Sequence, residues 1–442
     1  MWDSLPDCFL ERLGSALSAH EKRYGRPSDV SSARLACKAW AAAVSSGAET
    51  VSVSGPGPSG WGKRLFSRYE DGEAGAEAES YDREAAALSR PRSGGVRHLT
   101  WDDAPDGSAF EDAPLEGLTG YTASYCSHHD DNLAAMAAAC RRLERLEIRD
   151  GGVFRLWNRS LPLIAAITSL KKLTLFEALV TDVSALEPLA SLTELDLNGC
   201  NHLETGVEAL GRVTALTTID LRGTRVPPGD LVHLQNATSL SYSNYGVTVS
   251  ARFSDFCLPR LSSLHLLRVD VSGRSHIPSL ASLKLDGCAA DRDTKESLGR
   301  LTALARLEVH DNHVFEDDSL LLMPLSLTDL VVPNFPLLGI RRLTNLVSLN
   351  IVKDWMRMSP WPLRRIADSM PPGLRSLTLT DWSGHEWDAA VDAALAVPSL
   401  ASLSIVQRHG HYLSADALGK LAAATRLTSV IVNGRAVGKD PD

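Results

Sequence analysis

A short pattern of leucines recurs along most of this chain and constrains its fold more than any other feature. Each copy reads Leu-x-x-Leu-x-Leu, with Ile or Val accepted in place of the later leucines. The fourth and sixth positions alternate with mostly polar residues, which is the period of a strand with one buried and one solvated face. Copies begin at Leu143, Leu170, Leu192, Leu216, Leu261, Leu280, Leu304, Leu327, Leu346, Leu374, Leu400 and Leu427.

The spacing of these copies predicts how the strands assemble. They begin 19 to 28 residues apart, except for one interval of 45 that contains a degenerate copy at Leu240, with Ser243 and Tyr245 in place of the later leucines. A single strand cannot bury its own leucines, but a stack of strands forms a parallel sheet with one continuous core. The pattern resembles that of leucine-rich repeats. We therefore expect an α/β solenoid, with a curved parallel sheet on its concave side and helices or turns on its convex side.

The segments between the strands indicate an irregular solenoid. Residues 182–190, 204–213 and 416–424 carry apolar residues at helical spacing, whereas repeats of 19 residues have room for little more than a turn. The ninth position of a repeat favours Asn or Cys, which can satisfy backbone groups where the strand ends. Cys200, Cys288 and Asn312 follow this rule, but other repeats do not: the residues there are Phe335, Trp382 and Arg408.

Composition narrows the function classes. The chain has 442 residues, a formal charge of -9 and a pI near 5.8, which disfavours a surface that tracks nucleic-acid phosphates. Seven cysteines without framework spacing favour a reducing compartment. The longest apolar runs are too short to span a bilayer, and acidic residues at Asp3, Asp7 and Glu11 are unlike a secretory signal. We expect a cytoplasmic or nuclear protein without nucleic-acid or membrane partners.

The first fifty residues do not repeat and form two predicted helices. Ser4 is a candidate N-cap, and Pro6 and Asp7 suit the first turn of a helix. A second helix is expected from Asp29, with Leu35 and Trp40 on its apolar side. The pattern resembles an F-box in the residues Leu5, Pro6, Phe9, Leu13, Asp29, Val30 and Leu35-Ala36-Cys37-Lys38-Ala39-Trp40.

Together with the downstream repeats, this segment resembles the F-box/leucine-rich-repeat family of ubiquitin-ligase substrate receptors. The resemblance implies contact with a Skp-type adaptor, and through it a cullin, by Leu5, Pro6, Phe9, Leu13, Leu35 and Trp40. The alternative is a helical cap that only shields the first repeat. We expect residues 1–50 to form this helical segment, 51–95 a first strand and a flexible Gly/Pro-rich acidic insertion, and 96–442 the solenoid.

No motif predicts catalysis, a cofactor or a metal. The sequence Gly57 to Lys63 approaches a phosphate-binding loop, but Arg64 stands where Ser or Thr would hold magnesium. Two clusters of potential ligands lack the paired spacing of zinc sites, and we read them as solvated loops. They are Cys126, His128, His129 and Asp130, and the pair His409 and His411. The chain is therefore not expected to be an enzyme.

A binding face is expected where the outward residues of successive strands form a row on the concave side. The row reads Glu147, Thr174, Asp196, Asp220, His265, Lys284, Glu308, Val331, Asn350, Thr378, Ser404 and Ile431, and its polarity declines towards the C-terminus. Large aromatic residues on loops are common in binding hot spots. We predict a substrate site at the C-terminal rim, formed by Asn350, Trp355, Thr378, Trp382, Trp387, His409 and His411. The alternative is that the aromatic residues fill the interior of the longest repeats.

The expected function is protein recognition. The resemblance implies a non-catalytic substrate receptor of a Skp-cullin-F-box ubiquitin ligase, acting as a monomer within that complex. The alternative is a leucine-rich-repeat scaffold without a ubiquitin role, such as a cytoskeletal component or part of a ciliary axoneme. In that case the protein would be located in the cytoskeleton or the axoneme. A receptor for a small ligand has less support, because the row contains no compact polar pocket.

Overall fold

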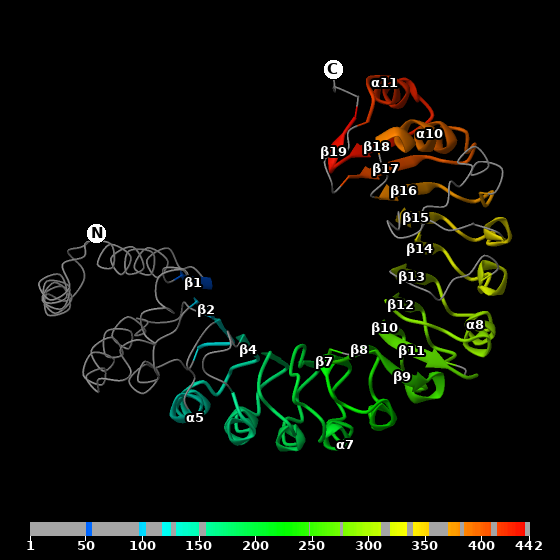
Figure 1. The fold of residues 1–442 in the computed structure, drawn as a ribbon. Coiled ribbons are helices and arrows are strands. Elements are labelled where there is room, and N and C mark those ends of the chain that lie inside the picture. The colour runs from blue at the N-terminus through cyan, green and yellow to red at the C-terminus, as the bar shows by residue number, and fades with distance from the viewer. Residues whose placement is uncertain are drawn as a thin grey trace, which may run out of the picture. The chain divides into compact units, whose positions relative to one another are not determined.

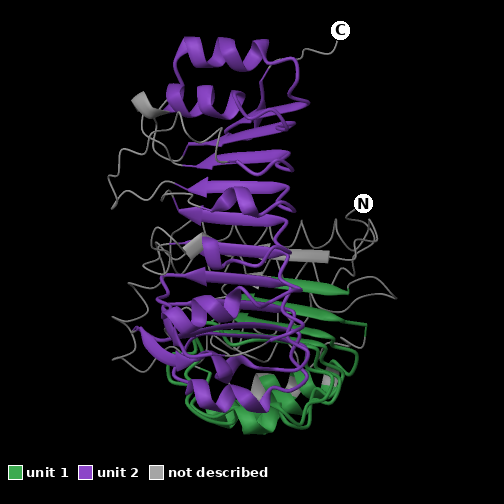
Figure 2. Ribbon diagram, turned by 90° about the vertical axis from the view of Figure 1, so that its right-hand side faces the viewer, with its two compact units in different colours: residues 1–216 green, residues 217–442 purple. Residues whose placement is uncertain are grey.

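The computed structural model describes the chain in two compact units, Met1–Leu216 and Thr217–Asp442, coloured separately in Figure 2. The F-box-like segment, with all of its predicted adaptor-binding residues, lies outside the described residues. The described residues are 50–54, 97–102, 117–124, 130–149, 156–246, 248–274, 277–310, 319–333, 339–352, 370–380, 384–407 and 413–437.

The first unit contains a parallel sheet in which each strand pairs with the next along the chain. Helices and single 3-10 turns connect the strands (Figure 1). The strands are β1 (Thr50–Ser54), β2 (His98–Asp102), β3 (Gly120–Ser124), β4 (Arg145–Arg149), β5 (Lys172–Phe176) and β6 (Glu194–Asp196). The connections include α5 (Asp130–Ala139), η3 (Asn158–Ser160), α6 (Leu161–Ala165), η4 (Ser184–Leu186) and α7 (Val207–Leu210).

The second unit continues the same plan with longer connections near its C-terminal end. Its parallel strands are β7 (Thr218–Thr224), β8 (Ser239–Asn244), β10 (Ser263–Leu267), β12 (Ser282–Asp286), β13 (Arg306–His310), β14 (Asp329–Pro333), β15 (Ser348–Val352), β16 (Ser376–Thr380), β17 (Ser402–Val406) and β18 (Ser429–Val432). The connections include η5 (Pro228–His233), η6 (Phe253–Phe256), α8 (Arg292–Leu298), η7 (Ser319–Leu322), η8 (Ile340–Arg342), α10 (Gly384–Leu395) and α11 (Ala415–Ala423).

The core of the second unit is a stack of leucines in register. Leu283 pairs with Leu264 on one side and with Leu307 on the other, and the row continues through Leu330 and Leu349. Each of these side chains is 0 or 1% exposed. Because each leucine contacts its counterparts in the flanking strands, the repeats share one continuous apolar core. The predicted fold, a leucine-rich-repeat solenoid with a parallel sheet, is confirmed.

One predicted register is wrong. Leu240 does not begin its copy of the motif but occupies the fourth position, in register with Leu264, and Tyr242 occupies the sixth, in register with Leu266. Ala237, fully buried, takes the first position. The tyrosine replaces a leucine because its ring packs 6.1 Å from that of Phe256 and its buried hydroxyl donates to the carbonyl of Val226 at 2.7 Å.

The chain also leaves the main sheet once. After β10, Arg268 adopts a left-handed conformation (φ 53°), and β11 (Val269–Ser272) then pairs in parallel with β9 (Val249–Arg252) in a separate two-stranded sheet. The left-handed residue turns the backbone between the two sheets. The long interval in the leucine pattern has a different cause: it contains the copy that starts at Ala237, whose first and sixth leucines are replaced by Ala237 and Tyr242.

Two cysteines perform the structural role predicted for the ninth position. The thiol of Cys200 donates to the carbonyl of Leu175 at 3.0 Å, and that of Cys288 to the carbonyl of Leu266 at 3.3 Å. Both thiols are buried, and burial raises the pKa of Cys288 to about 11. Each thiol therefore bonds to the backbone of the strand in the preceding repeat, and Cys288 does so as a neutral donor.

A hairpin closes the C-terminal edge of the second unit. The short strand β19 (Arg435–Ala436) pairs antiparallel with β18 through Asn433 (φ 49°) and Gly434 (φ 78°). Two successive left-handed residues, Asn then Gly, are typical of a tight two-residue hairpin turn. The Asn433 amide also exchanges hydrogen bonds with Gln407 at 2.7 and 2.9 Å, which anchors the turn to the end of β17.

Candidate binding face

The outward side chains of the second unit form one continuous row along the middle of the sheet. Strand register places each residue beside its counterpart on the next strand, and every member is partly exposed. The row reads Asp220, Ser241, His265, Lys284, Glu308, Val331, Asn350, Thr378, Ser404 and Ile431. It contains the predicted row of this unit with one addition: Ser241 was missed because the register at Leu240 was assigned wrongly.

The first part of this face, on strands β7 to β13, is charged, and its charges pair with one another. Arg222 binds Asp220 through its Nη2 at 2.6 Å and its Nε at 3.0 Å. Arg306 donates to Glu308 through Nε at 2.8 Å. Lys284 lies 4.0 Å from the Glu308 carboxylate, which is a looser contact. Most charges of this region are therefore neutralised inside the chain.

Two pKa shifts follow from this arrangement. Burial would raise the pKa of Glu308, but the hydrogen bond from Arg306 and the charges of Arg306, Lys284 and His310 outweigh it, and the pKa is lowered. Burial is the main cause that lowers the pKa of His265, and the cations Lys284 and Arg222 act in the same direction. His265 is therefore neutral at pH 7, and Glu308 is ionised.

The last part of the face, on strands β15 to β18, carries no charged side chain. We call these in-register outward residues the neutral patch. They comprise Ser348, Ser376, Ser402 and Ser429 in one column, Asn350, Thr378, Ser404 and Ile431 in the next, and Val352, Thr380 and Val406 in the third. Thr380 is nearly buried and its hydroxyl donates to the Asn350 side-chain oxygen at 3.1 Å. The patch therefore offers hydroxyls, one amide and small aliphatic groups.

The structure brings together two of the predicted substrate-binding residues. Asn350 and Thr378 are register partners on β15 and β16, and both are partly exposed. The side chain of Trp387 is 0% exposed in α10, so its assignment to a binding surface is wrong. It fills the interior of a long repeat instead, the role given by the alternative interpretation. Trp355, Trp382, His409 and His411 lie outside the described residues.

The outward face of the first unit has a different composition. Glu147 bonds to Arg149, and Lys172 pairs with Glu194 at 2.9 Å, so its charges also meet within the chain. Thr174, a member of the predicted row, is only 6% exposed. The Thr174 side chain is short and lies in register between the longer side chains of Glu147 and Asp196, which cover it.

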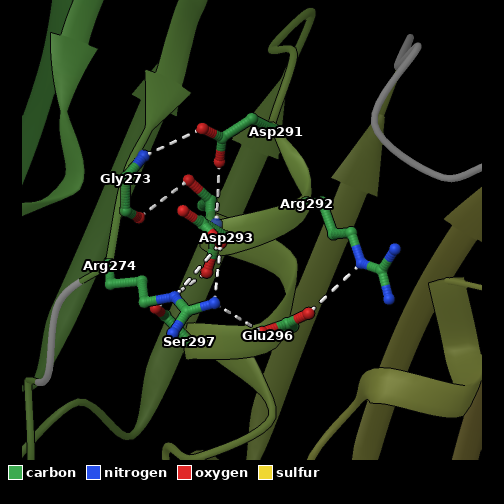
Figure 3. A network of polar contacts seen from close by, with 8 residues as sticks. Gly273, Arg274, Asp291, Arg292, Asp293, Glu296 and Ser297 are labelled. Atoms are coloured by element: carbon green, nitrogen blue, oxygen red, sulfur yellow. Dashed lines mark hydrogen bonds and ion pairs between the residues drawn. The ribbon is translucent and has the colours of Figure 1, made fainter.

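On the helical side of the second unit, a polar network holds α8 in place (Figure 3). Asp291 caps the helix by accepting from Thr294 N at 2.8 Å and also accepts from Gly273 N at 3.0 Å. Arg274 reaches Asp293 at 3.0 Å and Glu296 at 3.2 Å. Each of these groups has a partner in the network, so its role is to fasten the helix to the end of β11.

The described part of the chain was compared with two other kinds of site, a metal centre and a membrane-spanning helix. Within it, no three His, Cys, Asp or Glu residues are placed to share a metal ion. None of the helices described above has the length and apolar character needed to cross a membrane. The exposed outward face of the sheet therefore remains the candidate site.

Comparison with known proteins gives the fold and no family. No protein-family model matches the sequence, and no curated protein matches it. The structure of TLR13 in complex with ssRNA13 has a TM-score of 0.50 at 16% identity, over 78% of this chain and 52% of that chain. An internalin (inlF) from Listeria monocytogenes has a TM-score of 0.46 at 15% identity, over 79% of this chain and 88% of that chain. The likeness to TLR13 agrees with the leucine-rich-repeat fold.

Proposed function

We propose that this chain binds a partner protein through the outward face of its second unit and acts as a substrate receptor of a Skp-cullin-F-box ubiquitin ligase. The observation that carries the binding role is the continuous row of partly exposed side chains, in register from Asp220 on β7 to Ile431 on β18. A row held on a rigid sheet can contact an extended surface without reordering its backbone, which lowers the entropic cost of association.

The link to ubiquitin rests on the sequence of the first fifty residues. Leu5 and Pro6 open the F-box-like pattern, and Leu35 and Trp40 belong to the second of its two predicted helices. In this proposal the adaptor holds those helices, and the repeats present the target to the ligase. The chain contributes proximity and orientation, and other subunits carry out the transfer of ubiquitin.

Adaptor capture tests the proposal. The full chain should copurify with a Skp-type adaptor, and the double substitution Leu5→Asp and Pro6→Ala should abolish capture, because it removes apolar contact and places a charge in the interface. Thr378→Lys, on the outward face of β16, is the matched control and should leave adaptor capture unchanged.

Two results would contradict the receptor role. One is a wild-type chain that captures no adaptor. The other is capture that persists after the double substitution at Leu5 and Pro6. If the chain captures no adaptor but cosediments with microtubules, the result would support the structural scaffold instead.

A further inference from the structure

The outward face of the second unit changes its chemistry along the chain. Strands β7 to β13 present charged side chains that mostly pair with each other, such as Arg222 with Asp220 and Arg306 with Glu308. The last charged side chain before the neutral patch on this face is Asp329 of β14, and β15 to β18 then carry none. Two zones with different requirements for a partner therefore lie on the same sheet.

The neutral patch has hydroxyl groups that a partner could bind. Within the described part of the chain, the hydroxyls of Ser376, Ser402 and Ser404 have no side-chain hydrogen bond, and all three residues are partly exposed. Aliphatic groups at Val352, Val406 and Ile431 lie on the same face. A partner can thus gain hydrogen bonds and apolar contact here without first breaking an ion pair.

A charged partner group would bind poorly over this patch. Bringing a charge onto the sheet removes part of its water shell, and no opposite charge on β15 to β18 compensates for that loss. Hydroxyl and amide groups lose less on desolvation and can be satisfied by the serines and Asn350. The absence of charge on these four strands therefore selects against Asp, Glu, Lys and Arg in the partner segment that binds over the patch.

The size of the patch sets the length of the segment it can hold. Four neighbouring strands spaced about 4.8 Å apart span about 14 Å between the outer two. An extended chain advances about 3.3 Å per residue, so a segment of about five residues crosses them. We propose that the neutral patch binds an uncharged extended segment of a partner protein, about five residues long and rich in Ser, Thr, Asn, Gln and small aliphatic residues. This proposal rests on the proposed function only in assuming that the face binds a protein.

A random heptapeptide library displayed on phage tests this selectivity directly. The full chain is panned, and the retained peptides are measured against the double variant Thr378→Lys and Ser404→Lys. We expect the retained peptides to be depleted of charged residues relative to the input library. Their affinity for the double variant should fall at least tenfold, because two ammonium groups then stand in the middle of the patch.

Two further variants separate a change of charge from damage to the fold. Ser241→Lys makes the same kind of substitution on the same row but in the charged zone, and it should leave the affinity of these peptides unchanged. Thr378→Asp with Ser404→Asp introduces the opposite sign and should weaken the same peptides as strongly as the lysine pair does. The thermal unfolding midpoints of all variants should stay near that of the wild type.

Several outcomes would overturn the proposal. They are retained peptides with the charge content of the input library, binding that survives both double variants, equal loss with Ser241→Lys, and no retention above background. Adaptor capture is a separate readout, since it depends on residues 1–50. A chain that selects uncharged peptides but captures no adaptor would refute the ligase role and leave this inference standing.

Discussion

Tyr242 shows how a single residue can occupy a leucine position at no loss of burial. Its side chain is 0% exposed, its ring packs against Phe256, and its hydroxyl donates to Val226 O. A buried polar group is tolerated when its hydrogen bond is satisfied. Here the acceptor comes from the segment between β7 and η5, so the tyrosine joins two parts of one repeat.

Removing this hydroxyl should have a small but measurable cost. Tyr242→Phe leaves the Val226 carbonyl without its partner and should lower the free energy of unfolding by about 1 kcal/mol. Tyr242→Ala also deletes the ring and should cost about 3–5 kcal/mol. Urea unfolding monitored by circular dichroism measures both. A Tyr242→Phe variant as stable as the wild type would contradict the role given to the hydroxyl, and equal losses for the two variants would contradict the role given to the ring.

The lowered pKa of Glu308 implies that the free energy of unfolding depends on pH. Its pKa in the folded chain lies below the ordinary value of 4.5, since the hydrogen bond and the cations around it outweigh burial. A carboxyl of this kind contributes stability above its unfolded pKa, and that contribution is lost as the pH falls through the folded pKa. Glu308→Gln should therefore destabilise the chain by about 1–2 kcal/mol at pH 7 and by less at pH 3.

Urea unfolding at the two pH values checks this difference. Glu194→Gln is the control, because that carboxylate is about half exposed in its pair with Lys172 and should contribute about 0–1 kcal/mol. A loss for Glu308→Gln that is as large at pH 3 as at pH 7 would exclude the ionic explanation.

At the scale of elements, helix α11 depends on a residue just before it. Ser414 caps the helix by accepting from Ala417 N at 3.0 Å, and its hydroxyl donates to Asp388 of α10 at 2.7 Å. One hydroxyl thus serves both as a cap and as a link between neighbouring helices. The sequence Ser-Ala-Asp before an amphipathic run is typical of a helix start, and the helix was predicted within one residue at each end.

Loss of this cap should destabilise the C-terminal repeats. Ser414→Ala removes both hydrogen bonds and should cost about 1–2 kcal/mol. Ser414→Thr keeps the hydroxyl and should remain within a few tenths of a kcal/mol of the wild type. Thermal unfolding compares the two variants, and the prediction fails if threonine is as destabilising as alanine.

Elements that are determined by local residues could be predicted from the sequence, and elements that depend on distant contacts could not. The alternating leucines identify strands β4 to β7 and β10, β12 to β18, because a period of two and a fixed spacing are visible without tertiary information. Strands β2 and β3 were absent from the copies identified, since Trp101, Tyr121 and Ala123 replace the expected leucines. The second sheet was also missed, because β9 and β11 are short and depend on the turn at Arg268.

The binding face was predicted in part for the same reason. Strand periodicity correctly paired Asn350 with Thr378, whereas burial of Trp387 depends on contacts around α10 that no local pattern reveals. The serine column is also visible in the sequence, because Ser is the first residue of β15, β16, β17 and β18 and is followed in each by a buried Leu or Val.

At the scale of the molecule, each unit gains its stability from contacts between neighbouring repeats. Leu307 is fully buried and pairs with Leu283 and Leu330, one strand to either side. In such an array, damage to one repeat acts mainly on those next to it. The response to a core substitution should therefore be local within the second unit.

Hydrogen exchange can test this locality. Leu307→Ala should cost about 2–5 kcal/mol and speed amide exchange most in β12, β13 and β14, with less effect in β17 and β18. Ser404→Ala, which removes only an outward hydroxyl, serves as the control and should change exchange little. A uniform increase across the second unit after Leu307→Ala would indicate all-or-none unfolding instead.

The turn at Asn433 and Gly434 also determines what the last strand can do to other molecules. An unpaired strand at the end of a sheet is a template on which a further chain can grow, which is the first step of aggregation. Here β19 takes up that pairing, and it is only two residues long and begins with the exposed, charged Arg435. Among the described residues, the sheet of the second unit therefore ends in a strand that is too short and too charged to be a good template for fibres.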